Sequence, residues 1–217
     1  DILLLETGMG GLLDATNVCK SPLCTIIASI SMDHTQFLGN TLQEIYSQKL
    51  GIMKKDVPCV AYPVNEDLMT QWIEKCDENA TTGSSVMVDP SDIEMLYSGL
   101  DGSSYRYKGN TYDLAVPGIY QIYNSVVAVE TAYMLQKEGY DLENVNISDG
   151  LAATRWKGRF QKLMDEPPVY VDGAHNPGGW RALRKNIDTY FSGRDLIYIC
   201  GVFRDKDYRQ MLEIMMP

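Results

Sequence analysis

Short runs of consecutive apolar residues recur along the chain, separated by segments with helical periodicity. The continuous runs cover residues 2–5, 24–30 and 57–63. Because these runs lack polar alternation, they predict strands buried on both faces, as in a parallel sheet covered by helices. The same sheet is predicted to continue at residues 84–89. Residues 41–54 and 67–76 predict helices, and Thr41 with Glu44 has the spacing of a capping box at the start of the first one.

A different pattern follows in residues 95–116, which alternate and are rich in tyrosine. The pairs Asp101-Gly102 and Gly109-Asn110 interrupt the alternation, and such pairs are typical of hairpin turns. This segment predicts an antiparallel β-ribbon attached to the parallel sheet. A long helix is expected at about residues 120–138, and a shorter one within residues 142–156.

The alternation of strands and helices restarts after Trp156. Strands are predicted at residues 169–174 and 196–202, and helices at residues 178–191 and from residue 207 onward. The fold class is therefore α/β: a mostly parallel sheet flanked by helices with an antiparallel ribbon, followed by the start of a second, Rossmann-like α/β domain. Gly158 and the Pro167-Pro168 pair favour residues 157–168 as the joint. We expect domains at residues 1–156 and 157–217.

Composition narrows the class of protein. Of 217 residues, 45% are hydrophobic and 22% charged, as is usual for a soluble globular protein. The formal net charge of −10 argues against a nucleic acid or an anionic membrane as partner. Five cysteines without a CxxC pair indicate reduced thiols in a cytoplasmic protein rather than disulfides or a zinc site. The chain opens within an apparent strand and stops within a helical pattern, so we expect a piece of a longer protein.

Candidate chemistry gathers where predicted strands end. Glu6 follows the first predicted strand, and Asp33 and His34 follow the second. Ligands of open α/β sheets bind beyond the carboxyl ends of strands, where a carboxylate and an imidazole make a plausible metal pair. Taken singly, a glutamate after a strand is more often a helix-capping or ion-paired residue, and a lone histidine is more often an ordinary polar residue with its hydrogen bonds satisfied. Lys49 lies on the next helix, and its alternative interpretation is a solvated surface lysine.

A second cluster surrounds the segment DGAHNP. Asp172 ends a predicted strand, and His175 and Asn176 project from a turn before Pro177 begins a helix. A strand–turn–helix of this kind points backbone N–H groups at an anionic ligand. Arg159 lies at the predicted joint, where its guanidinium either clamps a phosphate or forms an interdomain salt bridge.

These residues belong to strings that occur together in a known order. ETGMGGLLDATN, SISMDHTQFLGNTLQEIYSQKLGIMKK, PGIYQIYNSVVAVE, WKGRF, DGAHNP and GVFRDKDY follow one another along essentially the whole chain. In this the chain resembles the folylpolyglutamate synthase and dihydrofolate synthase family of the Mur ligase superfamily. The resemblance implies an ATP-dependent ligase that adds L-glutamate to dihydropteroate or folate through an acyl phosphate. The alternatives are a non-catalytic nucleotide-binding module of the same fold and a Mur-type amide ligase with another acid substrate.

The resemblance also implies roles for residues of the first domain. Glu6 and His34 match magnesium ligands, although hard Mg²⁺ prefers oxygen donors to imidazole. Lys49 matches a catalytic lysine that carries a carbamate, an anion able to hold a second metal ion. Asp14 and Ala15 match the region that receives the pterin of the acceptor substrate.

Further roles follow for the nucleotide side of the site. By the resemblance, Asn124, Arg159 and Asp172 match residues that bind ATP. His175 matches a catalytic, substrate-binding residue near the glutamate and the γ-phosphate. The implied cofactors are ATP and Mg²⁺, and the expected protein is a cytoplasmic monomer whose partners are small-molecule substrates.

Several positions depart from the family pattern. Leu12 replaces a frequent arginine, Tyr120 stands where the motif PGxHQ has histidine, and Leu50 interrupts the usual KAG. These changes bear on fine substrate preference. The 217 residues contain no GTNGKGS-type phosphate loop, so the chain by itself lacks the backbone nest for the β- and γ-phosphates. We therefore expect it to be inactive on its own.

Overall fold

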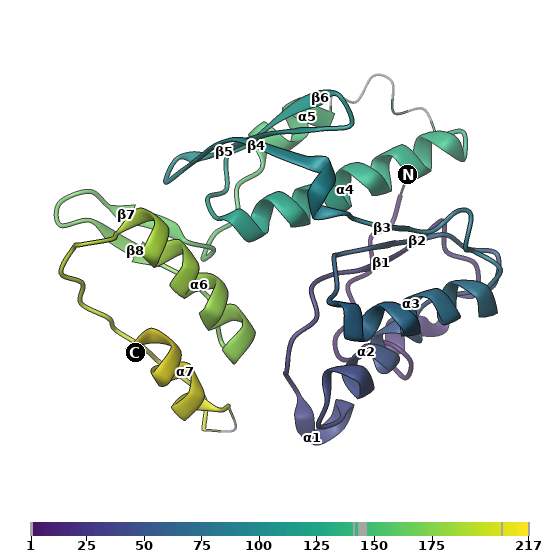
Figure 1. The fold of residues 1–217 in the computed structure, drawn as a ribbon, viewed down its shortest axis with the longest axis horizontal. Helices are drawn as coiled ribbons and strands as arrows, with labels where there is room; N and C mark the ends of the chain where they lie inside the picture. Colours follow the sequence, from purple (N-terminus) through teal and green to yellow (C-terminus); the bar gives the residue numbers. More distant parts are fainter. Residues whose placement is uncertain (1, 141, 143–146, 205, 217) are drawn as a thin grey trace. The chain divides into compact units, whose positions relative to one another are not determined.

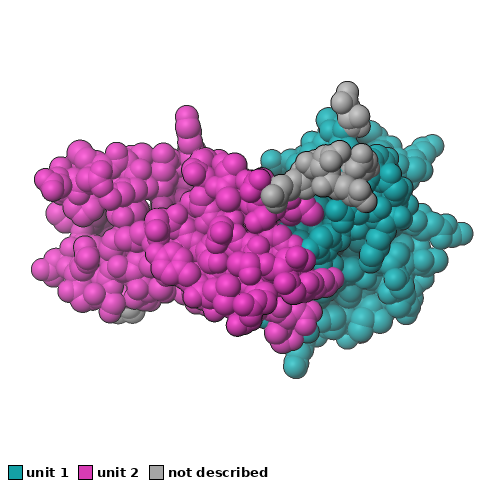
Figure 2. All heavy atoms as spheres, turned by 90° about the horizontal axis from the view of Figure 1, so that it is seen from above, with its two compact units in different colours: residues 1–90, 126–145 teal, residues 91–125, 146–217 magenta. Residues whose placement is uncertain are grey.

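The computed structural model describes residues 2–140, 142, 147–204 and 206–216. It divides into two compact units, which Figure 2 colours separately: unit 1 is residues 1–90 with 126–145, and unit 2 is residues 91–125 with 146–217. Helix α4 (Ile119–Lys137) contributes its first residues to unit 2 and the rest to unit 1. Among the described residues, we find no helix that is both long and apolar enough to cross a bilayer.

Unit 1 is built on a parallel sheet with the strand order β1-β2-β3 (Figure 1). Ile26 pairs with Val60, and Val60 pairs in turn with Val86. The central strand is fully buried, which matches its unbroken apolar sequence and confirms the predicted parallel sheet. The strands are β1 (Thr25–Ile27), β2 (Cys59–Ala61) and β3 (Val86–Met87).

Two helices of unit 1 bury side chains against this sheet, and a third, short helix has no buried residue. The predicted capping box is present at the start of α2, because Thr41 Oγ1 accepts from Glu44 N and Glu44 Oε2 accepts from Thr41 N. Tyr46 of α2 and Trp72 of α3 join the core that contains β1 and β2. The helices are α1 (Thr35–Leu38), α2 (Leu42–Leu50) and α3 (Glu66–Glu78).

Unit 2 contains the predicted antiparallel ribbon, a sheet with the order β4-β5-β6. Tyr105 in the middle strand is fully buried, and its hydroxyl lies 2.7 Å from Ser125 Oγ on α4. Gly109 has a φ of 81° at the second turn, a conformation that glycine adopts without strain. The elements are η2 (Pro90–Asp92), β4 (Ile93–Gly99), β5 (Gly102–Tyr107), β6 (Asn110–Leu114) and α5 (Ile147–Ala153), which lies against β6.

The rest of unit 2 is a hairpin and two helices around a small core. The hairpin strands β7 and β8 are antiparallel, and Lys162 pairs with Tyr170. Phe160, Trp180 and Met211 are buried together beneath them. The elements are β7 (Gln161–Met164), β8 (Val169–Val171), α6 (Pro177–Tyr190) and α7 (Tyr208–Met215).

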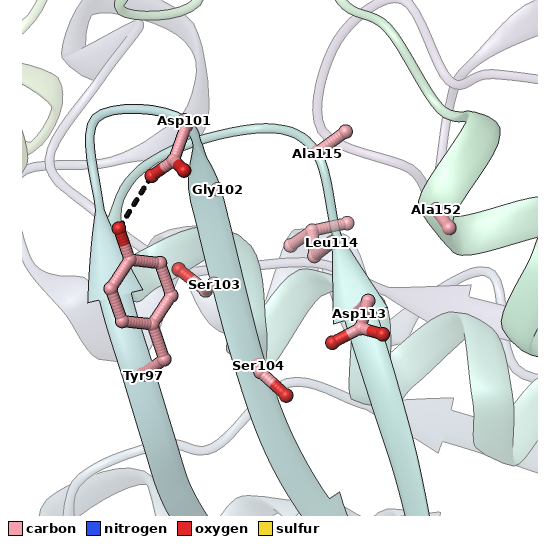
Figure 3. Close-up of a pocket in the computed structure, with 9 residues that line it drawn as sticks. All are labelled: Tyr97, Asp101, Gly102, Ser103, Ser104, Asp113, Leu114, Ala115 and Ala152. Carbon is pink, nitrogen blue, oxygen red and sulfur yellow. Dashed lines mark hydrogen bonds between the residues drawn. The ribbon is translucent and has the colours of Figure 1, made fainter.

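An open hollow of about 240 Å³ lies on the ribbon of unit 2 (Figure 3). Tyr97 Oη donates a hydrogen bond of 2.6 Å to Asp101 Oδ1 at its edge, and Ser104 and Asp113 line it from the two neighbouring strands. The predicted site residues are not part of this lining.

Two predicted strands are wrong. Residues 2–5 and 196–202 are irregular, and their apolar side chains are largely exposed, with Leu3 79% and Ile197 94% accessible. A strand needs a neighbour to receive its backbone hydrogen bonds, and the described residues supply none for either segment. Glu6 therefore does not follow a sheet strand. β7 also lies inside the segment that we expected to be a joint.

Candidate functional site

The loop of residues 8–17 is organised by the carboxylate of Asp14. Asp14 Oδ2 accepts from Met9 N at 2.9 Å, while Oδ1 accepts from Thr16 N at 2.9 Å and from Thr16 Oγ1 at 2.7 Å. These donors, with the Thr16 hydroxyl first, lower the pKa of Asp14 to about 2. Asp14 thereby caps the short helix η1 (Ala15–Val18). Its predicted contact with the pterin, and that of the exposed Ala15, stays a prediction.

The same loop lies directly on the last turn of α2. Leu12 N donates to Gln48 O at 2.8 Å, and Asn17 Nδ2 donates to Gly51 O at 3.2 Å. A Cβ on Gly11 would come within 2.9 Å of Gln48 O, and one on Gly51 within 2.4 Å of Leu12 Cβ. The glycines thus permit a backbone approach that any side chain would block.

The last turn of α2 carries Lys49, whose side chain is half-buried. Burial lowers the pKa of Lys49, and the negative charge of Asp33 opposes that shift. Asp33 Oδ1 also accepts from His34 N at 2.8 Å, and Asp33 Oδ2 lies 3.9 Å from His34 Nε2. His34 has left-handed dihedral angles, with φ of 49°. Asp33 is thus in direct contact with His34, and it acts on Lys49 through its charge.

These residues do not assemble a metal site by themselves. Across the described part of the chain, no three side chains of His, Cys, Asp or Glu gather closely enough to hold an ion. Glu6 is exposed on a segment that forms no strand. The magnesium roles of Glu6, His34 and Lys49 stay predictions, and we derive no reaction step through a metal.

In unit 2, Asp172 holds a turn beside the end of β8. Its Oδ2 accepts from Phe160 N and its Oδ1 accepts from Ala174 N, both at 2.8 Å. Gly173 N donates to Gly158 O at 2.8 Å, which ties the turn to the segment that contains Arg159. Both carboxylate oxygens of Asp172 thus shape the backbone on either side of the turn.

The turn leads into α6, whose first residues form a well-defined cap. Asn176 Oδ1 accepts from Gly179 N at 2.7 Å, and Pro177 occupies the first helical turn as predicted. His175 is exposed, and its Nδ1 lies 2.9 Å from Gly173 O. Because a carbonyl only accepts, Nδ1 carries the proton, and a neutral imidazole then has its lone pair on Nε2. Trp180 Nε1 also stabilises the turn by donating a hydrogen bond to Ala174 O.

Arg159 lies at the same turn. A Cβ on Gly173 would come within 2.7 Å of Arg159 Nη1, so the guanidinium lies close against Gly173 and would have to shift to admit a side chain there. The guanidinium carbon lies 5.6 Å from the centre of the Trp156 ring, within the range of a cation–π contact. Burial and then the charge of Asp172 raise the pKa of Tyr120 to about 12, while Arg159 opposes the shift.

The structure thus brings Arg159, Asp172 and His175 to one turn of unit 2, with Tyr120 and Trp156 beside them. Asn124 lies one turn further along α4 than Tyr120, and its Nδ2 donates to Gln121 Oε1 at 2.9 Å. The sequence had not assigned Trp156 or Tyr120 to the site. Two features of the sequence could have pointed to these residues. Tyr120 replaces the histidine of the motif PGxHQ, and Trp156 is the first residue of the motif WKGRF that contains Arg159.

Comparisons with known proteins bear on the family of the chain. Residues 158–216 match the family described as Mur ligase, glutamate ligase domain. The chain is 34% identical over 98% of its length to folylpolyglutamate synthase of Lacticaseibacillus casei, and 30% identical over 98% to dihydrofolate synthase/folylpolyglutamate synthase of Bacillus subtilis. It covers 50% of each of these relatives, so it spans about half the length of the curated proteins that it matches.

Solved structures give the same result. The chain superimposes on a complex of FPGS with AMPPCP and folate with a TM-score of 0.85 at 28% identity, over 96% of this chain and 52% of that one. Mycobacterium tuberculosis folylpolyglutamate synthase complexed with ADP gives a TM-score of 0.81 at 28% identity, over 97% and 48%. From the family match, the relatives and the shared fold, the chain belongs to the folylpolyglutamate synthase and dihydrofolate synthase family of the Mur ligases.

Proposed function

We propose that the complete gene product carrying this chain is an ATP-dependent ligase that adds L-glutamate to dihydropteroate or folate through an acyl phosphate. One observation supports it above the others: Arg159 from one motif and Asp172 and His175 from another lie at one turn that opens helix α6. A guanidinium beside a helix N-terminus is suited to bind a phosphate group.

The nucleotide is proposed to bind to unit 2. Arg159 would bind a phosphate, because its guanidinium is held in place by contacts with the Trp156 ring and with Gly173. Asp172 is proposed to orient the nucleotide through the turn that it stabilises, and Asn124 to contact the base. Solved relatives in complex with AMPPCP and with ADP support the binding of a nucleotide.

The acceptor is proposed to bind to unit 1, near the loop of residues 8–17 and Lys49. Asp14 and Ala15 would shape the pterin pocket. The lowered pKa of Lys49 increases the fraction of uncharged amine, the form that reacts with CO₂ to give the predicted carbamate. A relative solved with folate supports an acceptor of this class.

The proposed chemistry has two steps. A carboxylate oxygen of the acceptor attacks the γ-phosphorus of ATP, ADP leaves, and an acyl phosphate forms. The amino nitrogen of glutamate then attacks the acyl carbon, phosphate leaves with that oxygen, and the ammonium proton passes to a base. His175 Nε2 is our candidate for this base. Mg²⁺ would offset charge on the phosphate oxygens when bound.

Two further parts of the proposal concern the protein as a whole. We propose that it is a cytoplasmic monomer that acts on small molecules. A non-catalytic nucleotide-binding module of the same fold, or a Mur-type ligase with another acid substrate, remains the alternative. In either case the 217 residues alone are expected to release no ADP, because they lack a phosphate loop.

An acceptor panel tests the proposal. The complete gene product is incubated with ATP, Mg²⁺ and glutamate, together with dihydropteroate, with a monoglutamyl folate, or with a peptidoglycan-type acid as the control. We expect glutamate-dependent ADP release with at least one of the first two acceptors and none with the third. ADP release only with the third would support the Mur-type alternative, and nucleotide binding without turnover would support the non-catalytic module.

A further inference from the structure

The side chain of Asn17 connects its own loop to two residues just beyond α2, more than 30 positions away in the sequence. Its Nδ2 donates to Leu12 O at 2.9 Å and to Gly51 O at 3.2 Å. Its Oδ1 accepts from Lys54 Nζ at 2.6 Å. One amide therefore joins the loop of residues 8–17 to the end of α2 and to the segment that follows the helix. We call Asn17 and Lys54 the clip.

The partners of the clip specify an amide and its orientation. An ammonium group only donates and a carbonyl only accepts, so Oδ1 must face Lys54 and Nδ2 must face Leu12 and Gly51. A flipped amide would direct N–H groups at an ammonium and an oxygen at two carbonyls. A carboxylate would keep the contact with Lys54 and lose both donors. Asparagine is thus the side chain whose length and polarity fit all three partners.

The clip lies next to the turn that carries Lys49. Leu12 N donates to Gln48 O, and Gly51 N donates to Lys49 O. A Cβ on Gly11 would come within 3.1 Å of Lys49 O, which shows how closely the loop follows this backbone. A loop held at these points has a fixed position relative to Lys49, and the clip adds side-chain hydrogen bonds to Gly51 and Lys54 beyond the backbone bond from Leu12 N to Gln48 O.

We propose that the clip positions the acceptor loop against Lys49, so that Asn17 and Lys54 act as positioning residues for acceptor binding. This inference rests on the proposed function. Neither residue needs to touch a substrate, because a loop displaced by a fraction of an ångström misaligns the reacting groups. The expected signature is a raised KM for the acceptor and a lowered kcat, with the KM for ATP unchanged because the nucleotide is proposed to bind to unit 2.

Four variants of the complete gene product test the clip. Asn17→Ala removes all three bonds, Asn17→Asp removes the two donors and retains an acceptor for Lys54, and Lys54→Met removes a single bond. Lys55→Met is the matched control, because Lys55 is the exposed neighbour and the substitution makes the same change in charge. Hydrogen exchange of the loop is measured first, since it requires no activity.

We expect faster amide exchange within residues 8–17 in Asn17→Ala, Asn17→Asp and Lys54→Met, and wild-type exchange in Lys55→Met. Kinetics should show the acceptor KM raised about tenfold in Asn17→Ala, the size expected for losing a hydrogen bond to a charged group. Unchanged exchange in the first three variants would overturn the clip. Faster exchange with acceptor and ATP KM values within twofold of wild type would overturn its positioning role.

The test separates this inference from the proposed function. A wild-type protein that adds glutamate to neither dihydropteroate nor folate contradicts the proposed function and with it the positioning role, while the exchange data still decide whether the clip holds the loop. An active wild type with unaltered Asn17 and Lys54 variants contradicts the inference alone. A uniform rise in the KM of acceptor, ATP and glutamate would also overturn it, because general loss of structure would then explain the kinetics.

Discussion

The polar side chains of the glycine-rich loop form hydrogen bonds with the backbone of the loop. Asp14 accepts from Met9 N and from both donors of Thr16, and Asn17 binds two carbonyls and one ammonium. A turn alone would need only the glycines. The additional side chains fix the position of the loop against α2, and the turn of α2 that it contacts carries Lys49.

A first prediction concerns the carboxylate of Asp14. Thr16→Val removes the hydroxyl that contributes most to its low pKa, so the pKa of Asp14 should rise from about 2 toward its ordinary value of 3.8. The lowered pKa stabilises the folded loop above pH 4, and this contribution is lost as the pH falls through the folded value. Carboxyl ¹³C NMR between pH 2 and 6 measures the shift. Thr70→Val, at an exposed helix position, is the control, and an unmoved Asp14 titration would refute the assignment.

A second prediction concerns Lys49. Burial disfavours its charged form, so at neutral pH the ammonium costs stability, and this cost diminishes as the pH rises through the lowered pKa toward 10.5. Lys49→Met should therefore leave the urea midpoint of unfolding equal or higher. The same variant should lose about 100-fold in kcat, the usual scale for removing one preorganised polar group from an active site. A lower urea midpoint would contradict the cost of burying the Lys49 charge, and an unchanged kcat would contradict a role of Lys49 in the reaction.

At the scale of elements, short segments with strong local signals were predicted well. The capping box at Thr41 identified the start of α2, and the paired turn residues identified the ribbon β4-β5-β6. Both signals are interactions between residues close in sequence, so they do not depend on the tertiary structure of the rest of the chain.

The capping box gives a third prediction. Thr41→Ala removes the side-chain oxygen that accepts from Glu44 N, so the free energy of unfolding should fall by about 1 kcal/mol. Chemical denaturation of the variant measures the change. Ser47→Ala, on the exposed face of the same helix, should cost much less. Equal effects of the two substitutions would show that the cap contributes nothing specific.

Strand predictions failed where pairing, not local sequence, decides. Residues 2–5 and 196–202 have apolar runs as clear as that of β2, yet they form no strand, because a run becomes a strand only beside a partner. Conversely, β7 has a mixed sequence and pairs with β8 because the turn between them brings the two segments together. The hydrophobic pattern of a segment indicates whether it can form a strand, but it does not identify the strand with which it pairs.

The candidate site was recoverable from sequence to a similar degree. Asp172 and His175 were recognisable from one contiguous motif, and Arg159 from another. The contact of Arg159 with Gly173 and the effect of the Asp33 charge on Lys49 depend on tertiary structure. The bonds of Asn17 to Gly51 and Lys54 span 34 and 37 residues, so no local pattern contains them.

In the whole molecule, the candidate site residues are divided between the two units. Unit 1 holds the loop of residues 8–17 with Lys49, and unit 2 holds the turn with Arg159, Asp172 and His175. We propose that one receives the acceptor and the other the nucleotide. An acyl phosphate is the intermediate that connects the two halves of the proposal, because it contains atoms from both substrates.

The most direct test follows the oxygen atoms. The complete gene product is given folate or dihydropteroate labelled with ¹⁸O in the carboxylate that accepts glutamate, together with ATP and glutamate, and the released phosphate is analysed by mass spectrometry. We expect one ¹⁸O atom per phosphate, formed only when glutamate is present in the turnover. Phosphate without the label, or labelled water appearing in its place, would contradict the ligase mechanism.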